Sequence, residues 1–534
     1  MGRLQGVLCA TALGWMGAWA AAPAAQAAEV TRLTPPSAFH GVHGIRFGPG
    51  DVLLAGSVAG QSLYKVDVET GTAEVLVGPP DGMADDMAFG PGGQVVWTAI
   101  SNNIVYSRIG DGPVTRLDPD LVSVNAITFS RDGRRLFASQ VFGGDALWEL
   151  DPKGVKPRRL IRKDIGGFNS FAAGPDGWLY GPVWFKGQVA KINPDTGEIV
   201  VVAVGLNTPA SVKFDSRDTL YVIDSATGEV LRVDRSNGAK TRVAQLSSSL
   251  DNFAIDSRDR MFVSNMADNG IQEVDPATGA VRQVMRGPLA FPADVAVRVV
   301  DGRETLVVAD VFALRAVDGE TGQVTDLRRV HAKDEPLEYP TGVSIGAGGR
   351  AVLASSASGA VMIHDGAAPL KVLHGFNAPF EALELADGAL LVAEVGGDLV
   401  KVVGDTRTVV ASGLGAPGGM AAGPNGSVYV AETGGGRITR VDIASGARTT
   451  VAEGLKLPKA VAVAPDGSLV VLETGAKAVV AIDAATGART VIADNLPVGQ
   501  VTTPAVLAGG LDVGPSGTIY LTSDVENAIY RIRR

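Results

Sequence analysis

A pattern of short strands and turns recurs about every forty residues along this chain, and it constrains the fold more than any other feature. The unit is clearest at 418–455. Its four predicted strands are Met420–Ala422, Ser427–Ala431, Arg437–Asp442 and Arg448–Val451. Between the first two, Asn425-Gly426 supplies the positive φ that a tight hairpin needs. Four short strands in each repeat are typical of a β-propeller blade.

The turn after the first strand locates most of the other units. It occurs at Gly50, Gly92, Asp132-Gly133, Asp176-Gly177, Asp218, Asp259, Gly348-Gly349, Asp387-Gly388, Asn425-Gly426, Asp466-Gly467 and Ser516-Gly517. A further unit near Asp294 is irregular but keeps its later strands, which makes twelve units. One ring usually holds four to eight blades. We therefore predict an all-β fold of two tandem six-bladed β-propellers.

The ends of the chain indicate where the rings divide. Val30–Leu33 is a spare strand, and the last unit lacks a fourth strand. We expect Val30–Leu33 to complete the sixth blade of the first ring, and Ala280–Met285 to open the second ring and complete its last blade. The predicted domains are 28–278 and 279–534. A seven-plus-five division is the alternative, supported by the insertion His331–Glu338.

The first 27 residues have the character of an export signal. Arg3 precedes an apolar run, and Ala25-Gln26-Ala27 forms a small-residue cleavage site. We expect an exported protein, periplasmic or extracellular, without a membrane span. Cys9 is the one cysteine, so the mature chain has no thiol or disulfide chemistry. The net charge of -10 disfavours nucleic acid as a partner.

The residue just before the first strand of each unit carries a second pattern, because that strand lines the channel of a propeller. In the first six units this residue is His43, Asp85, Asn125, Asn169, Ala210 and Asp251. In the last six it is Ala293, Thr341, Glu381, Gly418, Lys459 and Gly509. Five of the first six offer oxygen or imidazole ligands, whereas Glu381 is the one good candidate in the second set.

Oxygen ligands of this kind are those that Ca²⁺ prefers. We therefore predict a calcium site at the mouth of the first channel, with zinc a weaker alternative because the mature chain lacks cysteine. The predicted ligands are drawn from Asp85, Asn125, Asn169, Asp251 and Asn252. The alternative is structural, since Asn and Asp before a strand often bind local backbone N–H groups. Trp184 and Phe185 are interpreted as packing residues, with an apolar wall for a ligand as the alternative.

Several stretches resemble known propeller families. Gly426–Thr433 resembles NHL-type and streptogramin-lyase-type repeats. Asn125–Gly133 and Asp251–Asp256 resemble the senescence-marker-protein/gluconolactonase and paraoxonase group of six-bladed calcium enzymes.

In gluconolactonase-like enzymes, a Glu, two Asn from neighbouring blades and an Asp hold the calcium. The resemblance implies that Asn125 and Asn169 are the two Asn, and Asp251-Asn252 resembles the Asp-Asn pair of paraoxonases. The chain departs from the pattern at His43, where the family has Glu, and at Ala210, where it has Asp.

Two classes of function follow. In the first, Ca²⁺ polarises the carbonyl of a small-molecule lactone or ester, and His43, Asp85 or Asp86 activates water. The resemblance implies a gluconolactonase-like hydrolase, and a streptogramin-lyase-like lyase would use a similar site. In the second, the protein is a non-enzymatic binding or scaffolding propeller that presents a rigid face to a protein or glycan.

Overall fold

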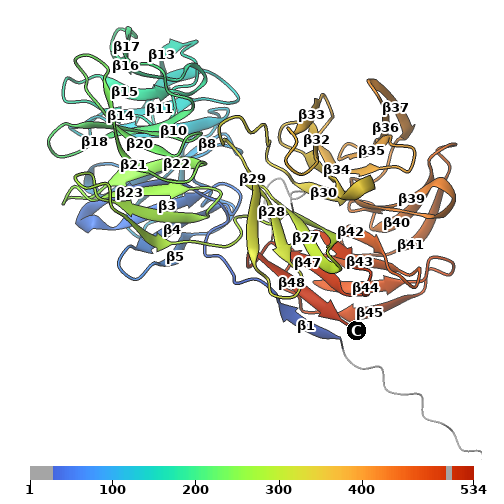
Figure 1. The fold of residues 1–534 in the computed structure, drawn as a ribbon. Helices are drawn as coiled ribbons and strands as arrows, with labels where there is room; N and C mark the ends of the chain where they lie inside the picture. The colour runs from blue at the N-terminus through green and yellow to red at the C-terminus, as the bar shows by residue number, and fades with distance from the viewer. Residues whose placement is uncertain (1–27, 501–507) are drawn as a thin grey trace, which may run out of the picture.

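The computed structural model describes residues 28–500 and 508–534, and it confirms the predicted all-β fold. The described residues form 48 β-strands and five short 3-10 turns, without an α-helix. The strands are arranged in twelve four-stranded antiparallel sheets, each the blade of a propeller (Figure 1). The predicted export signal and Cys9 lie outside the described residues, which contain no helix long and apolar enough to cross a membrane.

Six blades, each made of four consecutive strands, form the first ring. They span 42–77, 87–118, 124–163, 172–203, 209–245 and 250–285. The ring closes where β2 (Val42–Phe47) packs against β22 (Leu250–Ile255) and β23 (Met261–Asn265).

The second ring is built from the rest of the chain: five of its blades have four consecutive strands, and the last takes three strands from 511–533. Its blades span 294–329, 342–374, 379–411, 417–453, 458–493 and 511–533. This ring closes where β26 (Asp294–Val300) packs against β46 (Leu511–Val513) and β47 (Ile519–Ser523). The six-plus-six arrangement is thus confirmed, and the seven-plus-five alternative is wrong.

Burial within a blade follows from its place in the ring. The inner strand β10 (Val124–Phe129) is buried along its whole length, whereas the outer strand β13 (Arg159–Lys163) is largely exposed. Inner strands face the neighbouring blades on both sides and are therefore rich in apolar residues. The core is consequently a series of apolar layers between adjacent sheets, one of which contains Phe168, Phe171 and Leu147.

The predicted exchange of strands between the rings is wrong. β1 (Glu29–Arg32) pairs with β48 (Ala528–Arg533), so the N-terminal strand completes the last blade of the second ring. β25 (Val281–Met285) pairs with β24 (Gly270–Val274) and completes the sixth blade of the first ring. The strand at 281–285 therefore lies in the first ring, and the division near 278 falls inside that blade. Either pairing covers an exposed edge, so edge protection alone did not distinguish them.

The two rings are in direct contact (Figure 1). Arg329, at the end of β29 (Val324–Arg329), donates hydrogen bonds to the Asp268 carboxylate at 3.0 Å and to the carbonyl of Ser248 at 2.9 Å. Arg315 of β28 (Ala313–Asp318) also donates to the carbonyl of Ala267. These first-ring partners lie in loops at the end of the channel where the inner strands begin. The second ring therefore covers part of the first ring's mouth.

Candidate functional site at the mouth of the first ring

The mouth of the first channel brings together three of the predicted ligands. The Asn125 side-chain amide, in β10, donates a hydrogen bond of 2.5 Å to the carboxylate of Asp85, which precedes β6 (Met87–Phe89). Asp251, in β22, lies close enough for its charge to act on Asp85. Three blades thus supply one polar cluster, as the repeat position predicts.

Both carboxyl groups of this cluster are held toward the neutral form. Burial raises the pKa of Asp251 to about 8, and the charge of Asp86 adds to this effect. Burial likewise raises the pKa of Asp85 well above its usual range, helped by the charges of Asp251 and Asp86. Like charges in a poorly solvated site repel one another, and a bound cation removes that cost.

Two amides at the mouth have unused capacity for a ligand. The side-chain oxygen of Asn125 is buried without a hydrogen-bond partner among the described residues. Asn169, which precedes β14 (Ala172–Ala173), is 7% exposed, and its side chain makes no hydrogen bond to another described residue. Buried polar groups usually have partners, so the unpaired oxygen of Asn125, next to the carboxylate of Asp85, fits a cation with oxygen ligands.

Asp86 and Asn252 lie one step further along the inner strands and are engaged in the channel wall. The Asn252 amide donates to Asp86 at 3.2 Å, and its oxygen accepts from Ser211 at 3.0 Å and Ser170 at 3.2 Å. Asp86 also accepts the backbone N–H of Ile127 in the next blade. Of the predicted ligands, Asn252 is therefore committed to linking blades, and so is the predicted catalytic residue Asp86.

A buried lysine below this layer was not predicted from the sequence. Lys213 donates to the hydroxyl of Ser170 at 2.6 Å, and burial lowers its pKa to about 7, although the charge of Asp86 opposes the shift. Lys213 and Arg46 line a cavity of about 530 Å³ at the opposite end of the channel. Arg46 and Lys213 are each the next-to-last residue of an inner strand. An alignment of the repeats would therefore have shown a basic residue at the same position in two blades.

His43, the predicted water-activating residue, is fixed at the mouth in one tautomer. Its Nδ1 atom lies 3.0 Å from the carbonyl oxygen of Gly41, which can only accept a hydrogen bond. Nδ1 therefore carries the proton and Nε2 keeps its lone pair. Burial lowers the pKa of His43 to about 4, so the ring is neutral at physiological pH.

Two residues of the second ring also reach this mouth, and sequence reasoning missed both. The Tyr339 hydroxyl lies 2.6 Å from Nε2 of His331. Burial raises the pKa of Tyr339, and the negative charges of Asp251 and Asp85 add to the shift. His331 is near enough to His43 for the two imidazoles to influence each other electrostatically. The insertion His331–Glu338, taken as support for a seven-bladed ring, thus brings His331 and the following Tyr339 to the first-ring mouth.

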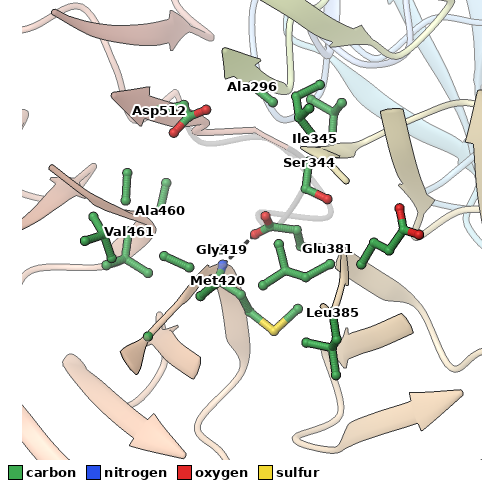
Figure 2. Close-up of a pocket in the computed structure, with 18 of the residues that line it drawn as sticks. Ala296, Ser344, Ile345, Glu381, Leu385, Gly419, Met420, Ala460, Val461 and Asp512 are labelled. Atoms are coloured by element: carbon green, nitrogen blue, oxygen red, sulfur yellow. Dashed lines mark hydrogen bonds between the residues drawn. The ribbon is translucent and has the colours of Figure 1, made fainter. Parts of the chain in front are cut away.

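The second channel contains a separate group of acidic residues. Asp294, Glu381 and Asp512 line a cavity of about 720 Å³ together with Ser344 and Met420 (Figure 2). Glu381 accepts the backbone N–H of Met420 at 2.6 Å, and Asp294 accepts that of Val343 at 2.8 Å. These carboxylates therefore join neighbouring blades, as Asp86 does in the first ring.

The sequence position used for prediction explains what was missed in this second channel. Glu381 and Asp294 both occupy the place that Asp86 holds in the first ring, as their hydrogen bonds to the next blade show. In the blade of Asp294 that place is one residue beyond Ala293, the residue assigned to the mouth, whereas Glu381 was itself the assigned residue of its blade. A one-residue shift along the inner strands would have found Asp294.

No group of three or more His, Cys, Asp and Glu side chains in the described ranges is arranged to hold a metal ion. The first mouth offers instead two carboxylates with two Asn amides. Such a mixed oxygen set suits Ca²⁺, which also takes carbonyl oxygens and water as ligands, and does not suit Zn²⁺.

Comparison with known proteins confirms the resemblance seen in the sequence. Residues 180–311 match the family model described as SMP-30/Gluconolactonase/LRE-like region. This stretch runs from the fourth blade into the seventh and includes Asp251. No curated protein matches the sequence.

Solved structures with similar folds share little sequence with this chain. A chain of a nidogen/laminin complex is 18% identical with a TM-score of 0.40, over 43% of this chain and 92% of that one. A streptogramin B lyase is 13% identical with a TM-score of 0.32, over 61% and 93%. The extracellular domain of BT4673 from B. thetaiotaomicron is 12% identical with a TM-score of 0.36, over 92% and 76%. Likeness at this level carries nothing about activity. The chain is therefore a tandem β-propeller protein that carries an SMP-30/gluconolactonase/LRE-like region in residues 180–311.

Proposed function

We propose that this protein is an exported, calcium-dependent hydrolase of small lactones or esters, with its site at the mouth of the first ring. One observation carries the proposal: Asp85 lies at the mouth within the influence of the charge of Asp251 and accepts a hydrogen bond from Asn125, whose own side-chain oxygen is buried without a partner among the described residues. The family match at 180–311 supports the reaction class, and the export-type sequence of residues 1–27 supports the location.

Asp85, Asp251, Asn125 and Asn169 would hold the cation. When bound, Ca²⁺ supplies positive charge that polarises a carbonyl oxygen. The two carboxylates would then be ionised, because an adjacent cation favours the charged form of an acid. The attraction of both carboxylates to the cation would also offset the repulsion between them in the buried mouth.

His43 would activate the attacking water. Its Nδ1 atom carries the ring proton, so the Nε2 lone pair is available above about pH 4. Nε2 takes a proton from water as the water oxygen bonds to the carbonyl carbon. The bond from that carbon to the ester or ring oxygen then breaks, and the departing oxygen receives the proton from His43. One water is consumed, and one carboxylic acid and one alcohol are formed.

The test combines activity with metal dependence. Signal-free protein is assayed against phenyl acetate, δ-valerolactone and glucono-δ-lactone, with calcium or with excess chelator. The proposal predicts hydrolysis that chelator abolishes, calcium restores and Asp251→Asn prevents. Hydrolysis that persists in chelator would contradict the metal role, and no turnover of any probe would contradict the reaction class.

A lyase acting on a cyclic lactone would use the same carboxylates, and the product distinguishes it. Hydrolysis adds the mass of one water to the substrate. Elimination leaves the mass unchanged and forms a carbon–carbon double bond. Mass spectrometry of the product from a cyclic depsipeptide lactone therefore separates the two reactions. Unchanged substrate together with calcium binding would favour the non-enzymatic binding propeller.

A further inference from the structure

A continuous row of aromatic side chains leads from the surface of the first propeller ring to the mouth of its channel. The successive centroid distances are 6.0 Å for Phe185–Phe142, 5.6 Å for Phe142–Trp184, 5.1 Å for Trp184–His331, 5.5 Å for His331–Tyr339, 6.1 Å for Tyr339–Phe312 and 5.3 Å for Phe312–His43. The outer end is open to solvent, with Phe185 62% and Phe142 50% exposed. The inner end, at Phe312 and His43, is buried.

The two rings of the protein share this row. Phe185, Phe142, Trp184 and His43 belong to the first ring, whereas His331, Tyr339 and Phe312 belong to the second. Exposed aromatic side chains are costly on a free surface and mark sites where an apolar group binds. The exposed outer pair, Phe142 and Phe185, is therefore the part of the row that an apolar group can contact, and the buried part continues toward the mouth.

Backbone contacts hold the second-ring part of the row in place. Ser249 of the first ring donates to the carbonyl of Val330 at 2.5 Å, and the N–H of Lys333 donates to the carbonyl of Ala226 at 3.0 Å. His331 and Tyr339 both have left-handed backbone conformations, with φ of 61° and 42°. Non-glycine residues adopt this region rarely, and then often at functional sites.

Phe312 is fitted closely against the first ring. A Cβ atom at Gly41 would lie 2.1 Å from Cε2 of Phe312, so a side chain at position 41 would displace the Phe312 ring. This glycine has φ of 73°, which also disfavours a side chain. The second ring thus packs directly against the mouth of the first.

Tyr339 can offer a hydrogen bond inside this mouth. Among the described residues, the one polar side-chain atom within hydrogen-bond reach of its phenol oxygen is Nε2 of the neutral His331 imidazole, at 2.6 Å. When Nε2 carries the imidazole proton, it donates to the phenol oxygen, and the phenol hydrogen is free for a ligand. The Tyr339 ring lies 6.1 Å from that of Phe312, which in turn lies 5.3 Å from His43 at the mouth, and the charges of Asp85 and Asp251 act on the phenol.

We propose that the second ring completes the site in the first. Tyr339 is a catalytic residue that donates a hydrogen bond to the departing oxygen of the substrate, and His331 is a positioning residue that orients the phenol. The aromatic row receives an apolar acyl or aryl group, so the substrate class is an apolar ester or lactone. This inference rests on the proposed function, because it places Tyr339 beside the same cation and the same reacting bond.

Tyr339→Phe tests the catalytic role without disturbing the packing, because it removes only the hydroxyl. Tyr530→Phe is the matched control, since that hydroxyl binds Glu526 in the last blade of the second ring. The first readout is luminescence of Tb³⁺ in place of Ca²⁺, excited through the aromatic rings. The second is kcat and KM for phenyl acetate and glucono-δ-lactone.

We expect Tb³⁺ luminescence in the wild-type protein, part of which is lost in Tyr339→Phe and none in Tyr530→Phe. We also expect kcat of Tyr339→Phe to fall on the order of 100-fold with KM little changed, the effect of removing one transition-state hydrogen bond. His331→Asn suits the left-handed backbone and should lower kcat less, with Tb³⁺ affinity unchanged.

The outcomes separate this inference from the proposed function. Normal Tb³⁺ binding and an unchanged kcat in Tyr339→Phe would overturn the role of Tyr339 and leave the calcium hydrolase standing. A wild-type protein that binds no Tb³⁺ and hydrolyses neither probe would overturn both.

The aromatic wall has its own test, because it concerns binding of the apolar group. Phe142→Ser should raise KM for phenyl acetate and leave that for glucono-δ-lactone unchanged. Equal effects on the two probes, or a wild-type preference for the polar lactone, would overturn the apolar substrate class.

Discussion

Val30 of β1 lies opposite Ile532 of β48, so the two ends of the described chain form one antiparallel pair. This pair covers the outer edge of the last blade of the second ring. The first ring has no strand of this kind, because each of its blades is built from four consecutive strands. The closure of the two rings therefore differs, although their blades have the same architecture.

Removal of residues 28–33 should destabilise the second ring selectively. The truncation exposes the edge of β48 and removes Leu33 from the apolar layer that contains Leu306 and Ile529. Differential scanning calorimetry should show a lower transition temperature for the second ring and a nearly unchanged one for the first. The variant Glu29→Gln, at the exposed start of β1, is the control. Selective loss of the first-ring transition would contradict the observed topology.

Arg315 is the most buried charged link between the rings, with 1% of its surface exposed. It binds the buried carboxylate of Asp310 at 2.5 Å and also reaches Asp326 and the carbonyl of Ala267. Arg315→Met leaves Asp310 buried without its counter-ion, which should cost about 3–5 kcal/mol. Urea unfolding measures the change, with the half-exposed Arg489→Met as control. Equal stability of the two variants would show that the ion pair adds little.

The carboxylates of the second channel make the protein less stable as pH rises. Burial raises the pKa of Asp294 to about 7, from a usual value near 4, and the charge of Asp512 adds to the shift. Between those pH values the folded state holds a proton that the unfolded state has released, so stability falls as pH increases from 4 to 7. Burial also raises the pKa of Asp512, to about 6, with the same sign.

Asp294→Asn should therefore reduce the drop in unfolding temperature between pH 5 and pH 8, measured in chelator. The matched control is Asp483→Asn, because backbone N–H groups lower the pKa of this exposed turn residue, so its ionisation affects stability only below about pH 4 and the substitution should leave the drop between pH 5 and pH 8 unchanged. A pH profile of Asp294→Asn that is identical to the wild-type profile would contradict the raised pKa.

The repeat and its turn chemistry were sufficient to predict the fold. Asn425, for example, has φ of 55° in the turn of its blade, as the Asn-Gly pair requires. The pairing of β1 was not predictable, because Val30–Leu33 has apolar and β-branched residues that would complete either ring. Choosing between two open edges depends on where the chain runs after Leu33, which is a long-range property.

The site was predicted only where it follows the repeat. Asp85, Asn125 and Asp251 share one repeat position and meet at one mouth, as their alignment predicts. Asn252 lies one residue further along the same strand, where the side chain bonds to neighbouring blades instead. His331 lies in the insertion His331–Glu338 and Tyr339 directly follows it, and this segment has no counterpart in other blades, so no alignment of repeats could place the two residues beside the first ring.

The central claim is that the first mouth binds a divalent cation through Asp85 and Asp251. Isothermal titration of calcium into chelator-treated, signal-free protein tests it most directly. The account predicts one site per chain in the wild-type protein, loss of binding in Asp251→Asn and Asp85→Asn, and normal binding in Asp111→Asn, whose side chain is fully exposed. No calcium binding by the wild-type protein, or equal binding by all four proteins, would contradict it.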